Sequence, residues 1–90
     1  MTDERYELVI SPTARRQLTE KLPEPVAFAA HEFIVGPLQN NPYRVGQRLR
    51  PPLDDRQSAR RGTYRVIYRI DDIHHSVTVV GVPHRSGAYR

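Results

Sequence analysis

Residues 58–70 constrain the fold more strongly than any other stretch of this 90-residue chain. They turn tightly at Gly62-Thr63 and continue as a run in which apolar residues occupy every second position. Because side chains on a strand alternate between its two faces, this run predicts the second strand of a β-hairpin, with one face packed on a core and one basic face. The two faces of that strand hold Tyr64, Val66, Tyr68 and Ile70 on one side and Arg65, Ile67 and Arg69 on the other.

The length of the chain predicts one domain, spanning residues 1–90, with a small core. The absence of cysteine excludes disulfides, zinc–thiolate sites and thiol nucleophiles. No apolar run approaches the ~20 residues that a membrane-spanning helix needs, and the first five residues do not resemble a signal peptide. We therefore expect a cytoplasmic protein that does not contact a membrane.

The charges are unevenly distributed. Fourteen basic residues, of which thirteen are arginine, stand against ten acidic ones, and residues 44–69 hold eight arginines but only two acids, Asp54 and Asp55. Arginine offers a planar fork of donors that matches phosphate oxygens. A genome that favours arginine codons is an alternative cause of the high arginine count. The clustering nevertheless favours a nucleic-acid-binding surface.

The first half of the chain reads as a strand followed by two helices. Residues 6–11 alternate as a short strand, and Ser11-Pro12 supplies a helix cap and a proline at the first helical position. An amphipathic helix follows and ends at Pro23, and a second helix runs from Glu24 until Gly36-Pro37 stops it. The very short link between the helices predicts an antiparallel αα hairpin. The apolar stripe of the first helix is Ala14, Leu18 and Leu22.

The second half predicts three more strands. Residues 39–50 are rich in turn formers and show no clear period, and Pro51-Pro52 marks a loop or a sheet edge. Residues 56–61 form the strand that enters the Gly62 turn, and residues 75–82 are apolar on both faces, which is typical of a central strand. The expected order is β-α-α-β-β-β. The fold class is α+β, with the αα hairpin packed on one face of a small, mainly antiparallel sheet.

Four motifs in this order resemble the RelE/ParE superfamily of toxins from toxin–antitoxin pairs, on the RelE side. The motifs are Ser-x-x-Ala-x-x-x-Leu at Ser11, Ala14 and Leu18; Gly-x-x-Leu at Gly46 and Leu49; Gly-x-Tyr-Arg-Val-x-Tyr at Gly62 to Tyr68; and the ending His84, Arg85, Tyr89 and Arg90. The resemblance spans almost the whole chain. Where RelE proteins usually carry lysines on the first hairpin strand, this chain has Arg56 and Ser58.

The resemblance implies a type II toxin that is a ribosome-dependent endoribonuclease. Such an enzyme cleaves messenger RNA in the ribosomal A site and inhibits translation, and it needs neither a metal nor a cofactor. The implied partners are the ribosome, its mRNA and a cognate antitoxin that wraps around the toxin. The stoichiometry of that neutralised complex, with a heterotetramer among the options, stays open.

The candidate catalytic residues are Arg65, His84, Arg85 and Tyr89. By resemblance, Arg65 contacts the scissile phosphate, Arg85 supplies further positive charge and Tyr89 is the C-terminal tyrosine of the family. We find no pair of carboxylates near the basic strip. His84 is therefore the candidate base or acid, because a histidine pKa of about 6.5 lies near the operating pH. The candidate RNA-binding residues are Arg48, Arg50, Arg56, Arg60, Arg61 and Arg69.

Plainer interpretations exist for several of these residues. His84 is equally consistent with a solvated loop histidine, and Tyr89 with a loose terminus. Tyr64 and Tyr68 are expected in the core or at its rim rather than as platforms that stack on bases. The segment 71–75, Asp-Asp-Ile-His-His, superficially suggests a metal site. We predict none there, because adjacent strand residues point to opposite faces and the aspartates suit a turn.

Two other functions fit the same sequence. One keeps the fold and changes the target: a ParE-like inhibitor of DNA gyrase, against which the complete His-Arg-x-x-x-Tyr ending speaks. The other is a non-catalytic module that binds RNA or the ribosome, which includes a toxin that has lost its activity. Cleavage of transcripts on expression separates the endoribonuclease from both.

Overall fold

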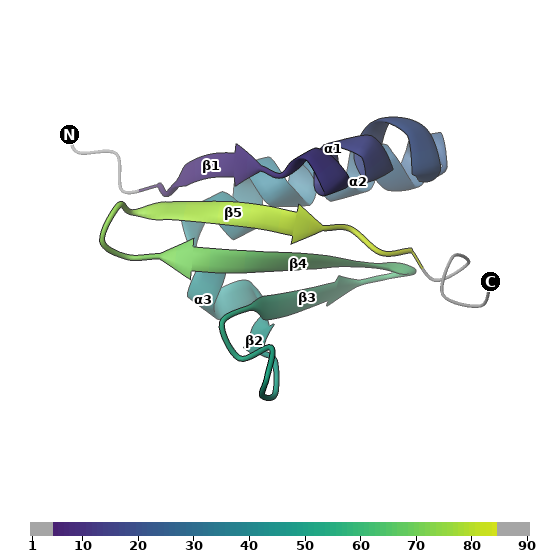
Figure 1. Ribbon diagram of the computed structural model, residues 1–90. Helices are drawn as coiled ribbons and strands as arrows, with labels where there is room; N and C mark the ends of the chain where they lie inside the picture. The colour runs from purple at the N-terminus through teal and green to yellow at the C-terminus, as the bar shows by residue number, and fades with distance from the viewer. Residues whose placement is uncertain (1–4, 85–90) are drawn as a thin grey trace.

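The structure is a computed structural model that describes residues 5–84. Three short helices, two π-helical turns and five strands follow one another in the chain (Figure 1). The elements are β1 (Glu7–Ile10), α1 (Pro12–Arg16), η1 (Gln17–Lys21), α2 (Glu24–Phe33), η2 (Ile34–Leu38), α3 (Pro42–Val45), β2 (Gln47–Arg48), β3 (Gln57–Arg61), β4 (Tyr64–Asp71) and β5 (Ser76–Gly81).

The five strands form one mixed sheet in the order β1-β5-β4-β3-β2. β1 pairs with β5 in parallel, and every other pair is antiparallel. This arrangement confirms the α+β class, the mainly antiparallel sheet and the internal position of residues 76–81. The sequence did not predict β2, because a strand of two residues carries no periodic signal.

The first helix begins where the sequence predicts. Ser11 is its N-cap, with its Oγ accepting a hydrogen bond from the backbone N–H of Ala14 at 3.1 Å. Pro12 occupies the first helical position, where a missing N–H costs nothing. The helix continues through η1 to Lys21, and α2 returns beside it, as Figure 1 shows. The αα hairpin is therefore confirmed.

The predicted stop at Gly36-Pro37 is wrong. The second helix passes through both residues as the π-helical turn η2, and residues 39–40 are still helical. The wider turn explains why: the backbone N–H of Gln39 reaches the carbonyl of Ile34, five residues back. A proline has no N–H to place in a tight helical ladder, and a π turn tolerates the gap. The short helix α3 follows directly and was not predicted either.

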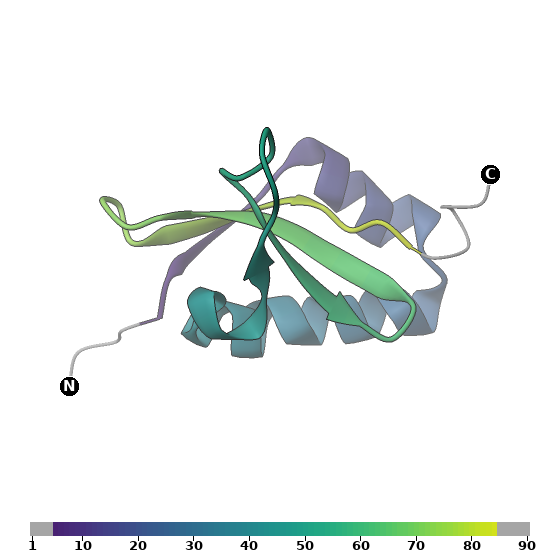
Figure 2. The ribbon, with the colours of Figure 1, turned by 90° about the horizontal axis from the view of Figure 1, so that it is seen from below.

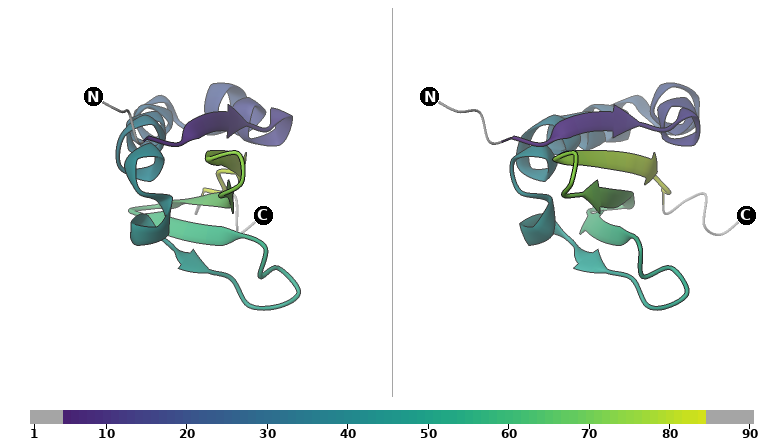
Figure 3. Two further views of the ribbon diagram at one scale, coloured as in Figure 1. Left: turned by 90° about the vertical axis from the view of Figure 1, so that its left-hand side faces the viewer. Right: turned by 60° about the vertical axis from the view of Figure 1, so that its left-hand side comes forward.

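One face of the sheet is covered and the other is open. Figure 1 shows α2 behind the sheet, and Figures 2 and 3 show the loop between β2 and β3 standing out on the side away from α2 and α3. We call the side without a covering helix the open face. Tyr64, Val66 and Tyr68 are buried beneath the helices, whereas Arg65 and Arg69 are exposed, so the predicted alternation is confirmed. The buried apolar residues are Ala14, Ala30, Phe33, Ile34, Leu38, Ala59, Tyr64, Val66, Tyr68, Val77, Val79 and Val82.

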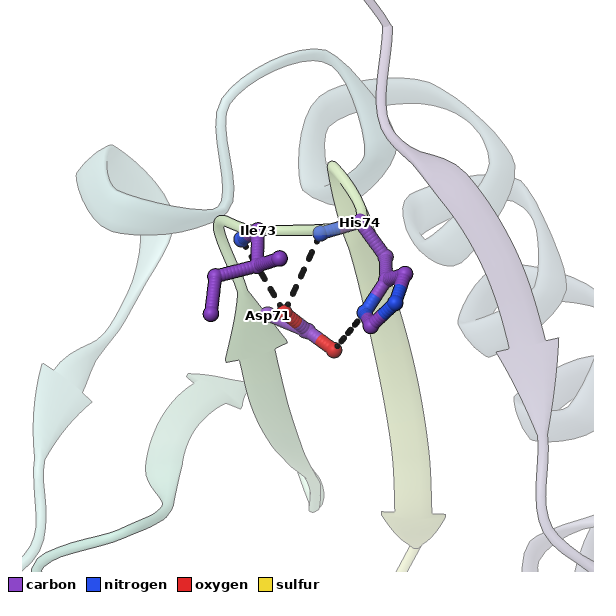
Figure 4. Close-up of polar contacts among 3 residues, drawn as sticks. All are labelled: Asp71, Ile73 and His74. Atoms are coloured by element: carbon purple, nitrogen blue, oxygen red, sulfur yellow. Dashed lines mark hydrogen bonds and ion pairs between the residues drawn. The ribbon is translucent and has the colours of Figure 1, made fainter.

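The turn between β4 and β5 is held by Asp71 (Figure 4). Its Oδ1 accepts hydrogen bonds from the backbone N–H groups of Ile73 and His74, and its Oδ2 lies 2.8 Å from His74 Nδ1. These hydrogen bonds, that of the His74 side chain above all, lower the pKa of Asp71. His75 instead stacks on Tyr6 with ring centroids 4.0 Å apart. The two histidines thus have separate contacts, in keeping with turn chemistry.

The described part of the chain holds no group of three or more His, Cys, Asp or Glu side chains placed to hold a metal ion. Within the same residues, no helix combines the length and the apolar character required to span a membrane.

Candidate nucleic-acid interface

Four arginines gather on the open face. Arg65 and Arg69 leave β4 on that face, and Arg60 lies directly opposite Arg65 on β3. Arg56 immediately precedes β3 on the same side, because Gln57 pairs with the inward-facing Tyr68. The neutral pair formed by Ser58 and Ile67 lies between the two arginine pairs. The open face therefore carries two separate basic clusters.

The first cluster is the cross-strand pair of Arg60 and Arg65. Side chains directly opposite in an antiparallel sheet have Cβ atoms about 5 Å apart, and like charges in that position repel. Both side chains are exposed, and neither forms an ion pair with another described residue. The backbone N–H of Arg65 donates to the carbonyl of Pro83 at 3.0 Å, which ties the chain just before the C-terminal segment to this site. An anion bound between the guanidinium groups would relieve their repulsion.

The second cluster joins Arg56 and Arg69 to Asp55. Asp55 Oδ1 lies 3.7 Å from Arg56 Nε, and Asp55 Oδ2 lies 4.0 Å from Arg69 Nη1. One carboxylate, that of Asp55, therefore does approach the basic strip, and a single carboxylate is not the pair that the sequence analysis looked for. The loop between β2 and β3 folds back toward β4, and no local sequence pattern signals that path.

Two of the candidate RNA-binding residues leave the sheet on the helix-covered side. Arg61 pairs with Tyr64 and shares its face, and its guanidinium carbon lies 4.6 Å from the ring centroid of Phe33. Its Nη2 also donates to the carbonyl of Val45 at 3.4 Å. Arg48 pairs with Gln57 and so shares the inner side as well. These side chains do not belong to the open face, and Arg61 packs as part of the edge of the core.

The remaining candidates lie at the two ends of the sheet. Arg50 is exposed in the loop that follows β2. His84 forms an isolated bridge with Tyr64, and its Nε2 lies 3.0 Å from Thr63 Oγ1 in the hairpin turn. Since directly opposite residues share a face, His84 leaves the backbone on the side away from Arg65.

The structure therefore does not bring His84 and Arg65 together on one face. No sequence pattern pointed to Thr63, whose hydroxyl contacts His84. Arg85 and Tyr89 lie outside the described residues.

The tyrosines of the hairpin are core residues, as expected. Tyr64 is buried, and burial raises its pKa, an effect that the positive charge of Arg61 opposes. Tyr68 is fully buried and donates to the carbonyl of Pro42 at 2.6 Å. Burial raises the pKa of Tyr68 to about 12. Neither ring is placed to stack on a base from the open face.

The end of β5, which leads to His84, is fixed by the first helix. β5 carries an irregularity in its pairing with β4 near Val80, whose carbonyl accepts from Ser11 Oγ at 3.1 Å. The backbone N–H of Val82 donates to Gln17 Oε1 at 2.5 Å. The side chains of Ser11 and Gln17 thus take the place of a neighbouring strand for the part of β5 that extends beyond the end of β1. They direct the chain past Arg65 toward the C-terminus.

Comparison with known proteins gives near full-length relatives. The chain is 50% identical over 88 residues to Toxin RelE of Mycobacterium tuberculosis, an alignment that covers 98% of this chain and 90% of the relative. It is 48% identical over 85 residues to Toxin RelG of the same organism, which covers 94% and 97%. No family model matches the sequence.

Solved structures show the same fold. The toxin–antitoxin complex RelBE2 of Mycobacterium tuberculosis contains a chain that superposes with a TM-score of 0.86 at 48% identity, covering 91% of this chain and 93% of that one. A mutant of E. coli toxin RelE in the free state gives 0.71 at 22% identity, covering 94% and 88%. The archaeal RelE–RelB complex from Pyrococcus horikoshii gives 0.68 at 21% identity, covering 90% and 96%. At these lower identities the likeness concerns the fold alone.

Proposed function

The chain belongs to the RelE family of type II toxins, and we propose that it is an endoribonuclease that cleaves messenger RNA in the ribosomal A site. The cleavage inhibits translation. The observation that carries this proposal is the exposed pair of Arg60 and Arg65 on a sheet face that no helix covers. Two guanidinium groups that form no ion pair with a carboxylate of residues 5–84 are a ready site for a phosphodiester.

The reaction that such a site would serve is attack of the ribose 2′-hydroxyl on the adjacent phosphorus. The bond to the 5′ oxygen then breaks, which leaves a cyclic phosphate and a 5′-hydroxyl. A base takes the proton of the 2′-hydroxyl and an acid returns one to the 5′ oxygen. Arg65, assisted by Arg60, stabilises the charge that develops on the phosphoryl oxygens, a contribution of about 10²–10³ in rate for one preorganised donor.

The proton-transfer groups in this proposal come from the C-terminal segment. His84 acts as base or acid, Arg85 adds positive charge at the phosphate, and Tyr89 orients the leaving group or donates to it. His84 stands at the end of the sheet beside Thr63, 3.0 Å from its hydroxyl, so it would reach the RNA around that end rather than from the open face. General acid–base help of this kind contributes about 10²–10⁴ in rate.

The proposed partners follow from the family. RelBE2 and the archaeal RelE–RelB are complexes of a toxin with its antitoxin, and we expect this chain to bind a cognate antitoxin in the same way. Its other partners would be the ribosome and mRNA, and its site of action the cytoplasm, where translation occurs. The exposed arginines of the open face supply the electrostatic attraction to RNA.

The proposal is tested by controlled expression in a bacterial host. Growth should stop, translation should fall, and transcripts should be cut within codons. The double variant Arg65→Ala/Tyr89→Ala should permit growth and leave transcripts whole, whereas Arg15→Ala, an exposed arginine on α1, should behave as the parent does. Growth arrest and cleavage that survive the double variant would show that the site is assigned wrongly. DNA damage without cut transcripts would favour gyrase inhibition instead.

A further inference from the structure

The cluster of Asp55, Arg56 and Arg69 is built differently from the pair of Arg60 and Arg65. A surface that only attracts phosphate gains nothing from a carboxylate, yet Asp55 lies against both arginines on the loop that stands out over this side of the sheet (Figures 2 and 3). The carboxylate cancels part of their charge. The cluster therefore binds a phosphate less strongly than the pair of Arg60 and Arg65 does. Unlike that pair, it offers both hydrogen-bond donors and acceptors.

The three side chains keep unused hydrogen-bonding capacity. The separations of 3.7 Å and 4.0 Å exceed the N···O distances of about 2.7–3.2 Å that hydrogen bonds require. Among the described residues, neither oxygen of Asp55 accepts a hydrogen bond. Arg56 Nε is buried and finds no hydrogen-bond partner within residues 5–84. The side chains of Asp55 and Arg69 are each about half exposed, so a ligand can reach them.

We propose that Asp55 and Arg69, supported by Arg56, form a subsite that recognises a guanine base of the RNA. The Watson–Crick edge of guanine presents one carbonyl oxygen beside two N–H donors. Two carboxylate oxygens can accept both N–H groups while a guanidinium donates to the carbonyl oxygen. No other RNA base offers two adjacent donors to one carboxylate. Proteins read single-stranded RNA in this way, through the edges of unpaired bases.

The position of the cluster suits a base near the cleaved bond. Arg69 lies four residues from Arg65 along β4, which is about 13 Å in an extended strand. The neutral pair of Ser58 and Ile67 separates the two arginine clusters. With the scissile phosphate at Arg65, the cluster would meet a base of the same codon. This inference rests on the proposed function, because it assigns the base that the nuclease site would prefer.

The test compares guanine with inosine, which lacks only the exocyclic amino group. Ribosomes are programmed with codons that carry either base at each position in turn, and cleavage rates are measured for the parent, Asp55→Asn and Asp54→Asn. Asp54 is the matched control, since it precedes Asp55 in the same exposed loop and forms no ion pair with a described residue. At one codon position the parent should cleave the guanine codon about 10-fold faster than the inosine codon. Asp55→Asn should cleave both at one rate, and Asp54→Asn should keep the preference.

An equal guanine-to-inosine ratio in the parent and Asp55→Asn would overturn the subsite. So would a uniform acceleration of all codons by Asp55→Asn, because that result would mean the carboxylate merely masks positive charge. A second measurement does not depend on cleavage: titration of the full chain with GMP and with IMP, followed by NMR. Binding of GMP over IMP that Asp55→Asn abolishes supports the subsite, and equal binding refutes it. Failure of the parent to cleave any codon would contradict the proposed function alone.

Discussion

Replacing Gly46 by alanine should destabilise the fold far more than an exposed methyl group normally does. Gly46 has extended backbone angles that any residue adopts, so backbone strain is not the reason. A Cβ at this position would press against the hydroxyl of Tyr68 and come within 2.8 Å of the carbonyl oxygen of Ser58. That hydroxyl is the group that donates to Pro42 at 2.6 Å. The added methyl group would therefore displace the Tyr68 hydroxyl and weaken the hydrogen bond that holds α3 to the sheet.

The magnitude follows from two terms. Overpacking a closed site costs about 1–3 kcal/mol, and disturbing a buried hydrogen bond adds about 1 kcal/mol. A loss of about 2–4 kcal/mol is large against the total of about 5–13 kcal/mol expected for a chain of this length. The assay is urea denaturation followed by circular dichroism. Gly36→Ala is the matched control: nothing lies within 4 Å of its added Cβ, and alanine in a helix should gain about 0.5–1 kcal/mol.

A double-mutant cycle locates the cause. In a Tyr68→Phe background the clashing oxygen is absent, so Gly46→Ala should cost clearly less than it does in the parent. A neutral Gly46→Ala in the parent would mean that the added Cβ does not clash with Tyr68 or Ser58. An equal cost of the substitution in both backgrounds would mean that the Tyr68 hydroxyl plays no part.

Three further predictions concern the buried hydroxyl of Tyr68, the helix cap at Ser11 and the contact between Arg61 and Phe33. The pKa of Tyr68 is about 12 in the folded chain against 10.0 without the fold, so its contribution is complete below pH 10 and is lost as the pH rises toward about 12. Urea melts across that range should show a loss of about 2–3 kcal/mol that Tyr68→Phe removes. Ser11→Ala should lower the unfolding free energy by about 1 kcal/mol through the lost cap, and Thr13→Ala should lower it less. Arg61→Ala should lower it by about 0.5–1 kcal/mol through its contact with Phe33, while mRNA cleavage stays near the parent rate.

Local patterns predicted the parts of the fold that depend on local physics. The alternation in residues 64–70 identified β4 and its buried face, and Ser11-Pro12 identified the start of α1. The end of the second helix was missed because Gly36-Pro37 usually ends a helix. Here the π-helical turn η2 accommodates the missing N–H of Pro37, and Ile34 and Leu38 from that turn are fully buried. Burial of Ile34 and Leu38 stabilises the continued helix more than Gly36-Pro37 destabilises it.

The candidate site depended on which face each arginine takes. Arg65 could be placed from its own strand, whereas Arg61 lies across a two-residue turn and pairs with Tyr64, which puts it on the inner face. The turn at Gly62-Thr63 is visible in the sequence. Counting the alternation of faces across it places Arg61 on the same face as Tyr64. Asp55 was different. Its approach to Arg69 depends on the path of the loop between β2 and β3, which no periodic pattern encodes.

Single-turnover cleavage of mRNA on programmed ribosomes, with purified variants, tests whether the arginine pair on the open face governs the reaction. Arg65→Ala should reduce the cleavage rate about 10²–10³-fold and Arg60→Ala by a smaller factor, with ribosome affinity little changed. Arg15→Ala on α1 and Arg61→Ala beside Phe33 remove the same charge outside the arginine pair and should cleave at nearly the parent rate. Equal losses from all four variants would contradict the account, because they would mean that net charge, and not the arginine pair on the open face, governs the reaction.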